Sequence, residues 1–150
     1  MIRPHPAFAK SAIPTDHDLG AVRLKALSVE DNDRDFRAIM DSADEIKAAN
    51  PGLTWPDGLT PDKNLIDLAW HQTEFRRRRS FAWVMEAEDG AYLGCLYVYP
   101  ELGGMERADV YWWWRTGAAV DRGAFREDLT QWLAGEPWPR LDYRILERAT

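Results

Sequence analysis

The feature that most constrains the fold is a change of hydrophobic period near residue 81. Before it, apolar residues recur at three- and four-residue spacing, which is typical of helices; after it, they alternate, which is typical of strands. Alternation predicts three strands, at 81–86 (FAWVME), 92–99 (YLGCLYVY) and 108–115 (ADVYWWWR). Asp89 and Gly90, between the first two, favour a tight hairpin turn. Short connections join antiparallel neighbours, so this segment predicts an antiparallel meander.

The segments before the meander predict one strand and two helices. Residues 1–20 hold three prolines without periodicity and are interpreted as an extended arm. Residues 21–27 alternate as a half-buried strand. Ser28 and Asp31 resemble a capping box and begin a helix that ends at an Asn-Pro-Gly sequence. A second helix, 60–79, begins with a threonine cap and a proline and ends in four arginines, which suit the negative end of a helix dipole.

After the meander the period returns to that of a helix and then to that of a strand. Apolar residues at helical spacing predict a helix over 124–134, which a glycine and a proline end. Residues 140–145 alternate and predict a last strand, and we expect the tail, 147–150, to be exposed. The order strand, helix, helix, three strands, helix, strand predicts a single α+β domain over 21–150, without internal repeats.

Composition narrows the class of protein. The chain has 150 residues, a size that fits one domain with a core of its own. A net charge of −6 disfavours nucleic-acid binding, which needs a basic face. The single cysteine, Cys95, cannot form an internal disulfide and fits a reducing cytoplasm. The N-terminus shows no signal-peptide pattern, and no run approaches about 18 apolar residues, so we expect no membrane span.

Three stretches of sequence resemble the acyl-CoA N-acyltransferase (GNAT) superfamily: AVRLKALSVED, LGCLYVYPE and ADVYWWWR. The first is similar to the family's opening strand and capped helix, the second to its strand with a central glycine, and the third to its pantetheine-binding fourth strand. The resemblance covers about residues 20–146. Within the superfamily, the chain more specifically resembles a group of short bacterial GNAT-like proteins. It implies a mostly antiparallel mixed sheet flanked by helices, C-terminally truncated after the fifth strand, and acetyl transfer from acetyl-CoA to an amine.

The family's pyrophosphate loop, Q/R-x-x-G-x-G/A, has a degenerate counterpart at 120–125 (VDRGAF). In the family, the amides of this loop cradle phosphates at a helix N-terminus. Gly123 falls on the first glycine, Phe125 replaces a small residue and would obstruct the phosphates, and Arg122 can compensate by pairing with one. With the fourth strand, the resemblance implies a set of acetyl-CoA-binding residues: Trp112, Trp113, Trp114, Arg115, Arg122, Gly123 and Ala124.

Acyl transfer needs a donor to the thioester carbonyl, a base for the amine and an acid for the leaving thiolate. The resemblance implies a donor amide in a strand bulge within 111–114, the alternative being an ordinary paired strand. Glu101 and Asp109 are the candidates for the base, the alternative being solvated surface carboxylates. Tyr97, Tyr99 and Tyr111 lie on adjacent strands and are candidates to line an acceptor cleft or to donate to the thiolate, with Tyr111 the candidate for the acid. The alternative is a half-buried tyrosine with a solvated hydroxyl.

A second function, from another class, stays open. The domain would keep the fold without catalysis and would bind a small molecule or a protein partner through a tryptophan-rich cleft. Cys95 is interpreted as a small hydrophobe, and His5, His17 and His71 lack the spacing of metal ligands. For the enzyme, the substrate would be a small-molecule or protein amine, and an open strand edge would leave room for a homodimer.

Overall fold

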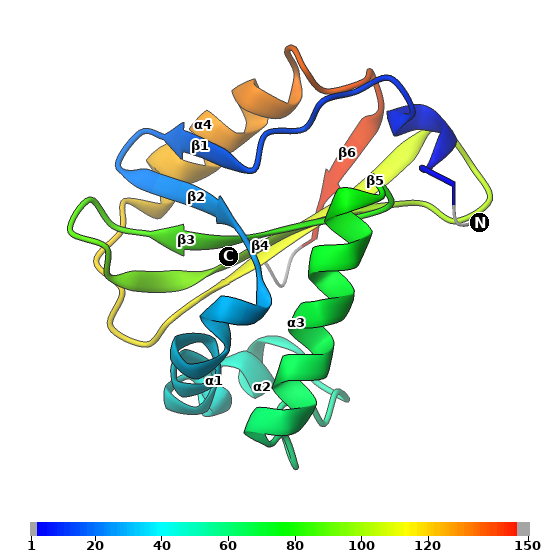
Figure 1. The fold of residues 1–150 in the computed structure, drawn as a ribbon. Helices are drawn as coiled ribbons and strands as arrows, with labels where there is room; N and C mark the ends of the chain where they lie inside the picture. The colour runs from blue at the N-terminus through cyan, green and yellow to red at the C-terminus, as the bar shows by residue number, and fades with distance from the viewer. Residues whose placement is uncertain (1–2, 147–150) are drawn as a thin grey trace.

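The computed structural model describes residues 3–146 as one six-stranded sheet with helices on both faces (Figure 1). The strands follow one another across the sheet in chain order, and neighbours are antiparallel except β5 and β6, which are parallel. The predicted tail, 147–150, lies outside the described residues. The elements are η1 (Pro6–Phe8), β1 (Asp16–Leu19), β2 (Val22–Ala26), η2 (Val29–Asp31), α1 (Asn32–Asp41), α2 (Ala43–Ala49), α3 (Pro61–Arg76), β3 (Phe81–Glu86), β4 (Tyr92–Pro100), β5 (Arg107–Trp114), α4 (Arg122–Leu133) and β6 (Asp142–Ile145).

The sheet has two apolar faces, as strand alternation predicts. Helix α4 and the N-terminal segment cover one face, over a cluster that includes Trp83, Leu96 and Leu129. Helices α1 and α3 cover the other face, over a smaller cluster that includes Val84 and Cys95. Successive side chains of a strand point to opposite faces, so the even-numbered positions of β5 face α4 and the odd-numbered ones face α1 and α3. The predicted meander, β3 to β5, therefore supplies both cores, and the α+β class is confirmed.

Two helix starts follow the predicted capping chemistry. The Ser28 hydroxyl accepts a hydrogen bond from the Glu30 amide at 3.2 Å, and the Asp31 carboxylate accepts one from the Ser28 amide at 3.0 Å. The Thr60 hydroxyl accepts one from the Lys63 amide at 3.2 Å. These side chains satisfy first-turn amides that have no partner within the helix, which fixes where each helix begins. Among residues 3–146, no helix is long and apolar enough to cross a membrane.

The single helix predicted from Ser28 to about residue 50 is divided into η2, α1 and α2. The division between α1 and α2 falls at Ser42, a buried residue whose hydroxyl donates to the Ala38 carbonyl at 2.8 Å. A serine side chain that bonds the backbone competes with the helical ladder and bends the helix. The same hydroxyl accepts a hydrogen bond from the Thr116 amide at 3.0 Å, so the break also anchors the loop after β5.

The N-terminal segment departs from the predicted extended arm. Within residues 1–20, β1 pairs with β2 as an edge strand, and η1 carries a fully buried Phe8. The Phe8 ring lies 5.0 Å from that of Phe81 and 6.1 Å from that of Trp138, centroid to centroid. Local periodicity missed this packing because the partners lie far along the chain. Whether 1–20 and 21–150 act as separate units stays a prediction.

Candidate functional site

The parallel pair formed by β5 and β6 covers only the first half of β5. The paired residues on β5 run from Arg107 to Val110, and the Leu146 amide donates to the Val110 carbonyl at 3.0 Å. Beyond Val110, no strand within residues 3–146 pairs with this side of β5. Main-chain groups of alternate residues point to the same side of a strand, so the amide and carbonyl of Trp112 point to the open side. β5 therefore presents a stretch of open edge.

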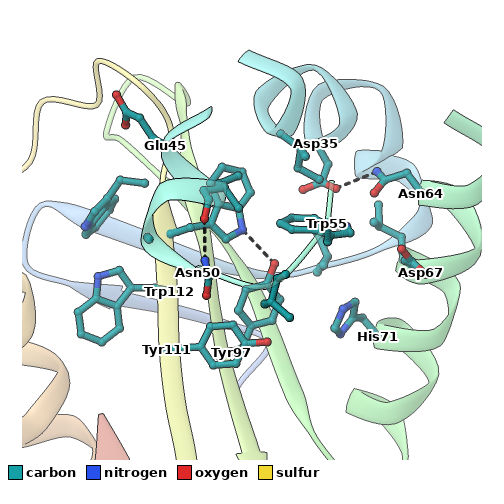
Figure 2. Close-up of a pocket in the computed structure, with 18 of the residues that line it drawn as sticks. Asp35, Glu45, Asn50, Trp55, Asn64, Asp67, His71, Tyr97, Tyr111 and Trp112 are labelled. Atoms are coloured by element: carbon teal, nitrogen blue, oxygen red, sulfur yellow. Dashed lines mark hydrogen bonds between the residues drawn. The ribbon is translucent and has the colours of Figure 1, made fainter. Parts of the chain in front are cut away.

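A cavity of about 540 Å³ lies beside this open edge. Its walls come from β4 and β5, from α1, α2 and α3, and from the loop that carries Trp55 (Figure 2). Arg122, at the start of α4, also lines the cavity, although α4 packs on the other face of the sheet. The cavity thus extends from α3, past the open edge of β5, to the N-terminus of α4.

The three consecutive tryptophans divide between the two faces of the sheet, because side chains alternate along a strand. The side chains of Trp112 and Trp114 are 4% and 6% exposed and pack edge-on against Phe125, with ring centroids 5.2 and 4.9 Å away. Trp113 faces the cavity, and its indole N–H donates to the Tyr97 hydroxyl at 3.0 Å. Because the side chains of Trp112 and Trp114 lie in the core, these two residues border the cavity through their main chain.

β5 is an ordinary paired strand where the resemblance implied a bulge. Its register with β4 runs without a shift from Ala108 to Trp114. The main chain of β5 is open because its pairing with β6 ends, and no bulge is required. At Gly94 of β4, where φ is +149°, an added Cβ would lie 1.9 Å from the Trp113 carbonyl oxygen. The two strands approach so closely there that only glycine fits.

The N-terminus of α4 holds the counterpart of the pyrophosphate loop. Asp121 is the N-cap residue, and its carboxylate accepts a hydrogen bond from the Ala124 amide at 3.0 Å. The amides of Arg122 and Gly123 have no acceptor among the residues that the structure describes. A Cβ on Gly123 would meet nothing closer than the Asp121 carboxylate, at an ordinary 3.6 Å. The loop thus offers two amides and a guanidinium to an approaching anion, together with one opposing carboxylate.

Phe125 does not obstruct this loop, which corrects the expectation from the sequence. Its side chain is 2% exposed and lies against the indoles of Trp112 and Trp114, on the α4 face of the sheet. The residue belongs to the first turns of α4, where the side chain turns inward while the helix end stays exposed. Phe125 is therefore part of the core, and the segment 120–125 is not closed by an aromatic ring.

Arg115, predicted to bind the cofactor, does not line the cavity. Its guanidinium pairs with the Asp41 carboxylate at 2.6 Å, at the end of α1. This ion pair lies beside the hydrogen bond from Thr116 to Ser42, so two contacts tie the end of β5 to the junction between α1 and α2. A role of Arg115 in cofactor binding stays a prediction.

Of the three catalytic candidates, only Tyr111 lines the cavity. The Glu101 carboxylate accepts hydrogen bonds from the amides of Glu106 and Arg107, at 2.8 and 3.1 Å, and closes the turn between β4 and β5. These bonds lower the pKa of Glu101, with the bond from the Glu106 amide contributing most, and make the carboxylate a weaker base. Asp109 is exposed on β5, away from the cavity lining. The roles of Glu101 and Asp109 as bases stay predictions.

Aromatic rings gather on the cavity side of β4 and β5. The rings of Tyr97 and Tyr111 stack with centroids 4.8 Å apart, and His71 of α3 lies 5.6 Å from Tyr97 and 6.5 Å from Tyr99. Burial lowers the pKa of His71 to about 4, so its imidazole is neutral at pH 7. The sequence spacing tests His71 only as a metal ligand and does not indicate this position. Its position three residues after the buried Leu68, on the sheet-facing side of α3, was the available signal.

A buried polar cluster forms another part of the cavity wall. Asp35 is 2% exposed and accepts hydrogen bonds from the Asn64 side chain at 2.9 Å, from the Tyr92 hydroxyl and from the Cys95 thiol at 3.5 Å. Burial raises the pKa of Asp35 and raises that of Cys95 well above its usual range, which keeps the thiol protonated. Within residues 3–146, no group of three His, Cys, Asp or Glu side chains could hold a metal ion.

The partial pairing of two parallel strands, a cavity at the open edge and a helix N-terminus beside it together define a class of fold. A mixed sheet of this topology, with α1 to α3 on one face and α4 on the other, is the fold of the GNAT acyl-CoA N-acyltransferases. The superfamily fold predicted from the sequence is thereby confirmed.

Solved structures of three acetyltransferases illustrate the likeness. RimL, a ribosomal L7/L12 alpha-N-protein acetyltransferase in complex with coenzyme A, superposes with a TM-score of 0.67 at 10% identity, over 79% of this chain and 67% of that one. The ribosomal-protein-S5-alanine acetyltransferase from Vibrio fischeri gives 0.65 at 10% identity, over 81% and 68%. The microcin C7 self-immunity acetyltransferase MccE, in complex with acetyl-CoA and AMP, gives 0.65 at 10% identity, over 82% and 68%.

This chain spans about two thirds of the length of each of these structures. At 10% identity the likeness establishes the fold alone. No family model and no curated protein matches the sequence.

Proposed function

We propose that this chain transfers an acetyl group from acetyl-CoA to an amine. The observation that carries the proposal is the open edge of β5, where the main chain of Trp112 borders a cavity that reaches Arg122. An open strand edge can hydrogen-bond an extended chain that contains amides, which is the chemistry of the pantetheine arm. RimL and MccE share the fold and are described with CoA and with acetyl-CoA, which supports the same donor here.

The reaction joins the amine nitrogen to the thioester carbonyl carbon and breaks the C–S bond, and the proton of the nitrogen ends on the sulfur. As the carbonyl oxygen gains negative charge, the main-chain N–H of Trp112 donates a hydrogen bond to it. Tyr111, the next residue on β5 and part of the cavity lining, is assigned to pass a proton to the leaving sulfur. Glu101 and Asp109 have no part in this scheme because neither lines the cavity.

The pyrophosphate of the donor is assigned to the start of α4. The amides of Arg122 and Gly123, the positive end of the helix dipole and the Arg122 guanidinium all attract an anion there. Asp121 opposes this attraction, because its carboxylate holds the Ala124 amide and adds a negative charge. We therefore expect weaker donor binding than a loop with an uncharged cap would give.

Binding of acetyl-CoA to the purified chain, measured by isothermal titration calorimetry, tests the proposal. We expect saturable binding and a higher melting temperature in the presence of the donor, because a ligand of the native state stabilises that state. Arg122→Ala should weaken binding about tenfold, the value of one charge-assisted hydrogen bond. Arg126→Ala, one turn further along α4 and exposed, is the matched control and should bind as the wild type does. No binding at millimolar acetyl-CoA would overturn the proposal.

A further inference from the structure

The α3 side of the cavity is walled by aromatic rings from three separate elements. Tyr97 and Tyr99 come from β4 and Tyr111 from β5, and the centroids of Tyr97 and Tyr99 lie 6.0 Å apart with nearly parallel rings. Trp55, in the loop between α2 and α3, is 36% exposed and stands across the same space (Figure 2). Flat aromatic faces bind apolar rings and attract cations, so this wall suits a flat, positively charged ligand.

Two carboxylates that border the cavity, Asp67 and Glu45, have no cation beside them among the described residues. Asp67 lies on α3 between Asn64 and His71 and borders the cavity (Figure 2). Within residues 3–146, no hydrogen bond or ion pair joins its side chain to another residue. Asp67 is an exposed residue, and the partial burial of its carboxylate raises its pKa. A cation bound beside Asp67 would supply the missing charge.

Charge is divided along the cavity. Arg122, beside the N-terminus of α4, is the only lysine or arginine among the described residues that line the cavity. On the α3 side, His71 adds no positive charge because burial holds its pKa at about 4. Glu45 of α2 adds a further carboxylate to the lining. The end assigned to the donor is thus cationic, and the rest of the wall carries only negative formal charge.

We propose, on the basis of the acetyl transfer proposed above, that the acceptor is a small primary amine with a flat apolar body. Its ammonium group binds beside Asp67 and gives up one proton to water before the neutral nitrogen attacks, and its body lies between Trp55 and the tyrosines of β4. Acceptors that carry a carboxylate next to the amine, such as free α-amino acids, are disfavoured because a second negative charge would face Asp67 and Glu45. A neutral ligand of the same shape loses the attraction of Asp67.

The test uses three small probes that share a phenyl ring, 2-phenylethylamine, 2-phenylethanol and phenylalanine, and one larger probe, a short peptide with a free α-amino group. Binding to the chain without acetyl-CoA is followed by tryptophan fluorescence, since Trp55 and Trp113 line the cavity. We expect 2-phenylethylamine to bind about tenfold more tightly than 2-phenylethanol, a factor that corresponds to about 1.4 kcal/mol, and more tightly still than phenylalanine.

Matched variants identify the charge that is responsible. Asp67→Asn should weaken the binding of 2-phenylethylamine about tenfold and leave that of 2-phenylethanol unchanged. Asp62→Asn, on the same helix and outside the cavity lining, should change neither. Trp55→Ala should weaken the amine and the alcohol alike, and truncation of this half-exposed loop residue leaves both cores intact.

The outcomes separate this inference from the proposed function. Equal binding of the amine and the alcohol, or an amine affinity that Asp67→Asn leaves unchanged, overturns the inference. Tighter binding of the peptide than of 2-phenylethylamine overturns it in favour of a protein acceptor. If 2-phenylethylamine binds as expected but acetyl-CoA releases no thiol in its presence, the cavity assignment is supported and acetyl transfer fails. Thiol release with other amines, without binding of 2-phenylethylamine, supports acetyl transfer and overturns the acceptor class.

Discussion

The two faces of the sheet are built from the same strands but differ in packing: one face is a closely packed aromatic core, and the other borders a cavity. Under α4, the ring of Trp112 packs against Phe125 and that of Trp83 against Trp132, and these side chains have little exposed surface. Under α1 and α3, aromatic side chains from the neighbouring positions border a cavity of about 540 Å³. On β5 the change from one environment to the other occurs between consecutive residues, because side chains alternate across the sheet. Aromatic content alone therefore does not indicate a binding site. The helices that cover each face determine whether the aromatic side chains are packed in a core or border a cavity.

The largest expected effect lies on the packed face. Phe125→Ala should lower the free energy of unfolding by about 3–5 kcal/mol, because it leaves a cavity between two buried indoles. Denaturant unfolding followed by circular dichroism measures the change. Trp55→Ala, the counterpart on the cavity face, should cost less than about 1 kcal/mol, since Trp55 is 36% exposed. Similar losses in the two variants would show that the faces are packed alike and would contradict the comparison.

The cavity face should instead respond to acid. The pKa of His71 is about 4 in the folded chain and 6.5 in the unfolded chain. As the pH falls, the unfolded chain therefore takes up the proton first. The stability contributed by neutral His71 is complete above pH 6.5 and is lost between pH 6.5 and 4, by up to roughly 3 kcal/mol. Burial raises the pKa of Asp35 and Asp67, so these groups act in the opposite sense and favour the folded chain as the pH falls.

Comparison of His71→Gln with the wild type isolates the histidine from those carboxylates. The glutamine variant cannot take up the proton, so its free energy of unfolding should fall less steeply from pH 7 to pH 4, whatever its stability at neutral pH. Urea titrations at several pH values measure both slopes. If the free energy of unfolding depends on pH in the same way in both proteins, then His71 titrates as a solvated histidine and water reaches this part of the cavity wall.

The smallest effect concerns the end of the cavity at α4. Asp121→Ser keeps an N-cap side chain and removes a negative charge, so acetyl-CoA should bind about three- to fivefold more tightly, with the gain reduced by salt. Arg115→Ala is the control: its ion pair with Asp41 is partly exposed, and we expect less than about 1 kcal/mol of destabilisation and unchanged donor affinity. Weaker donor binding in Arg115→Ala would restore the role that the sequence suggested.

Most of the fold could be predicted because its signals are local. The caps at Ser28 and Thr60 and the alternation along β5 depend on residues a few positions apart, and the structure bears them out. Two features could not be predicted in this way. The break at Ser42 depends on its hydrogen bonds to Ala38 and Thr116, and the ordered N-terminal segment depends on distant partners of Phe8. Each is a tertiary contact that no short window of sequence contains.

The candidate site was predictable only in part. Motif comparison found the cavity residues Tyr111, Trp113 and Arg122, which lie on the strand and helix start where the resemblance put them. It could not find Asp67, because α3 carries no motif and its function depends on which face meets the sheet. It misjudged Phe125 because a linear pattern does not say whether a side chain turns toward the helix end or toward the core. The sequence indicates where these residues lie along the chain, but it does not indicate which way their side chains point.

The main chain of Trp112 borders the cavity while its indole lies in the core, so the N–H proposed to act on the thioester does not depend on the identity of the side chain. Any amino acid except proline can supply the same N–H, so evolution can exchange the indole freely as long as the core stays filled. Alanine scanning would report this position as structural and overlook the role that we propose for its main-chain N–H. Only a change of the peptide bond itself, such as an ester in place of the amide at Trp112, would separate the two contributions.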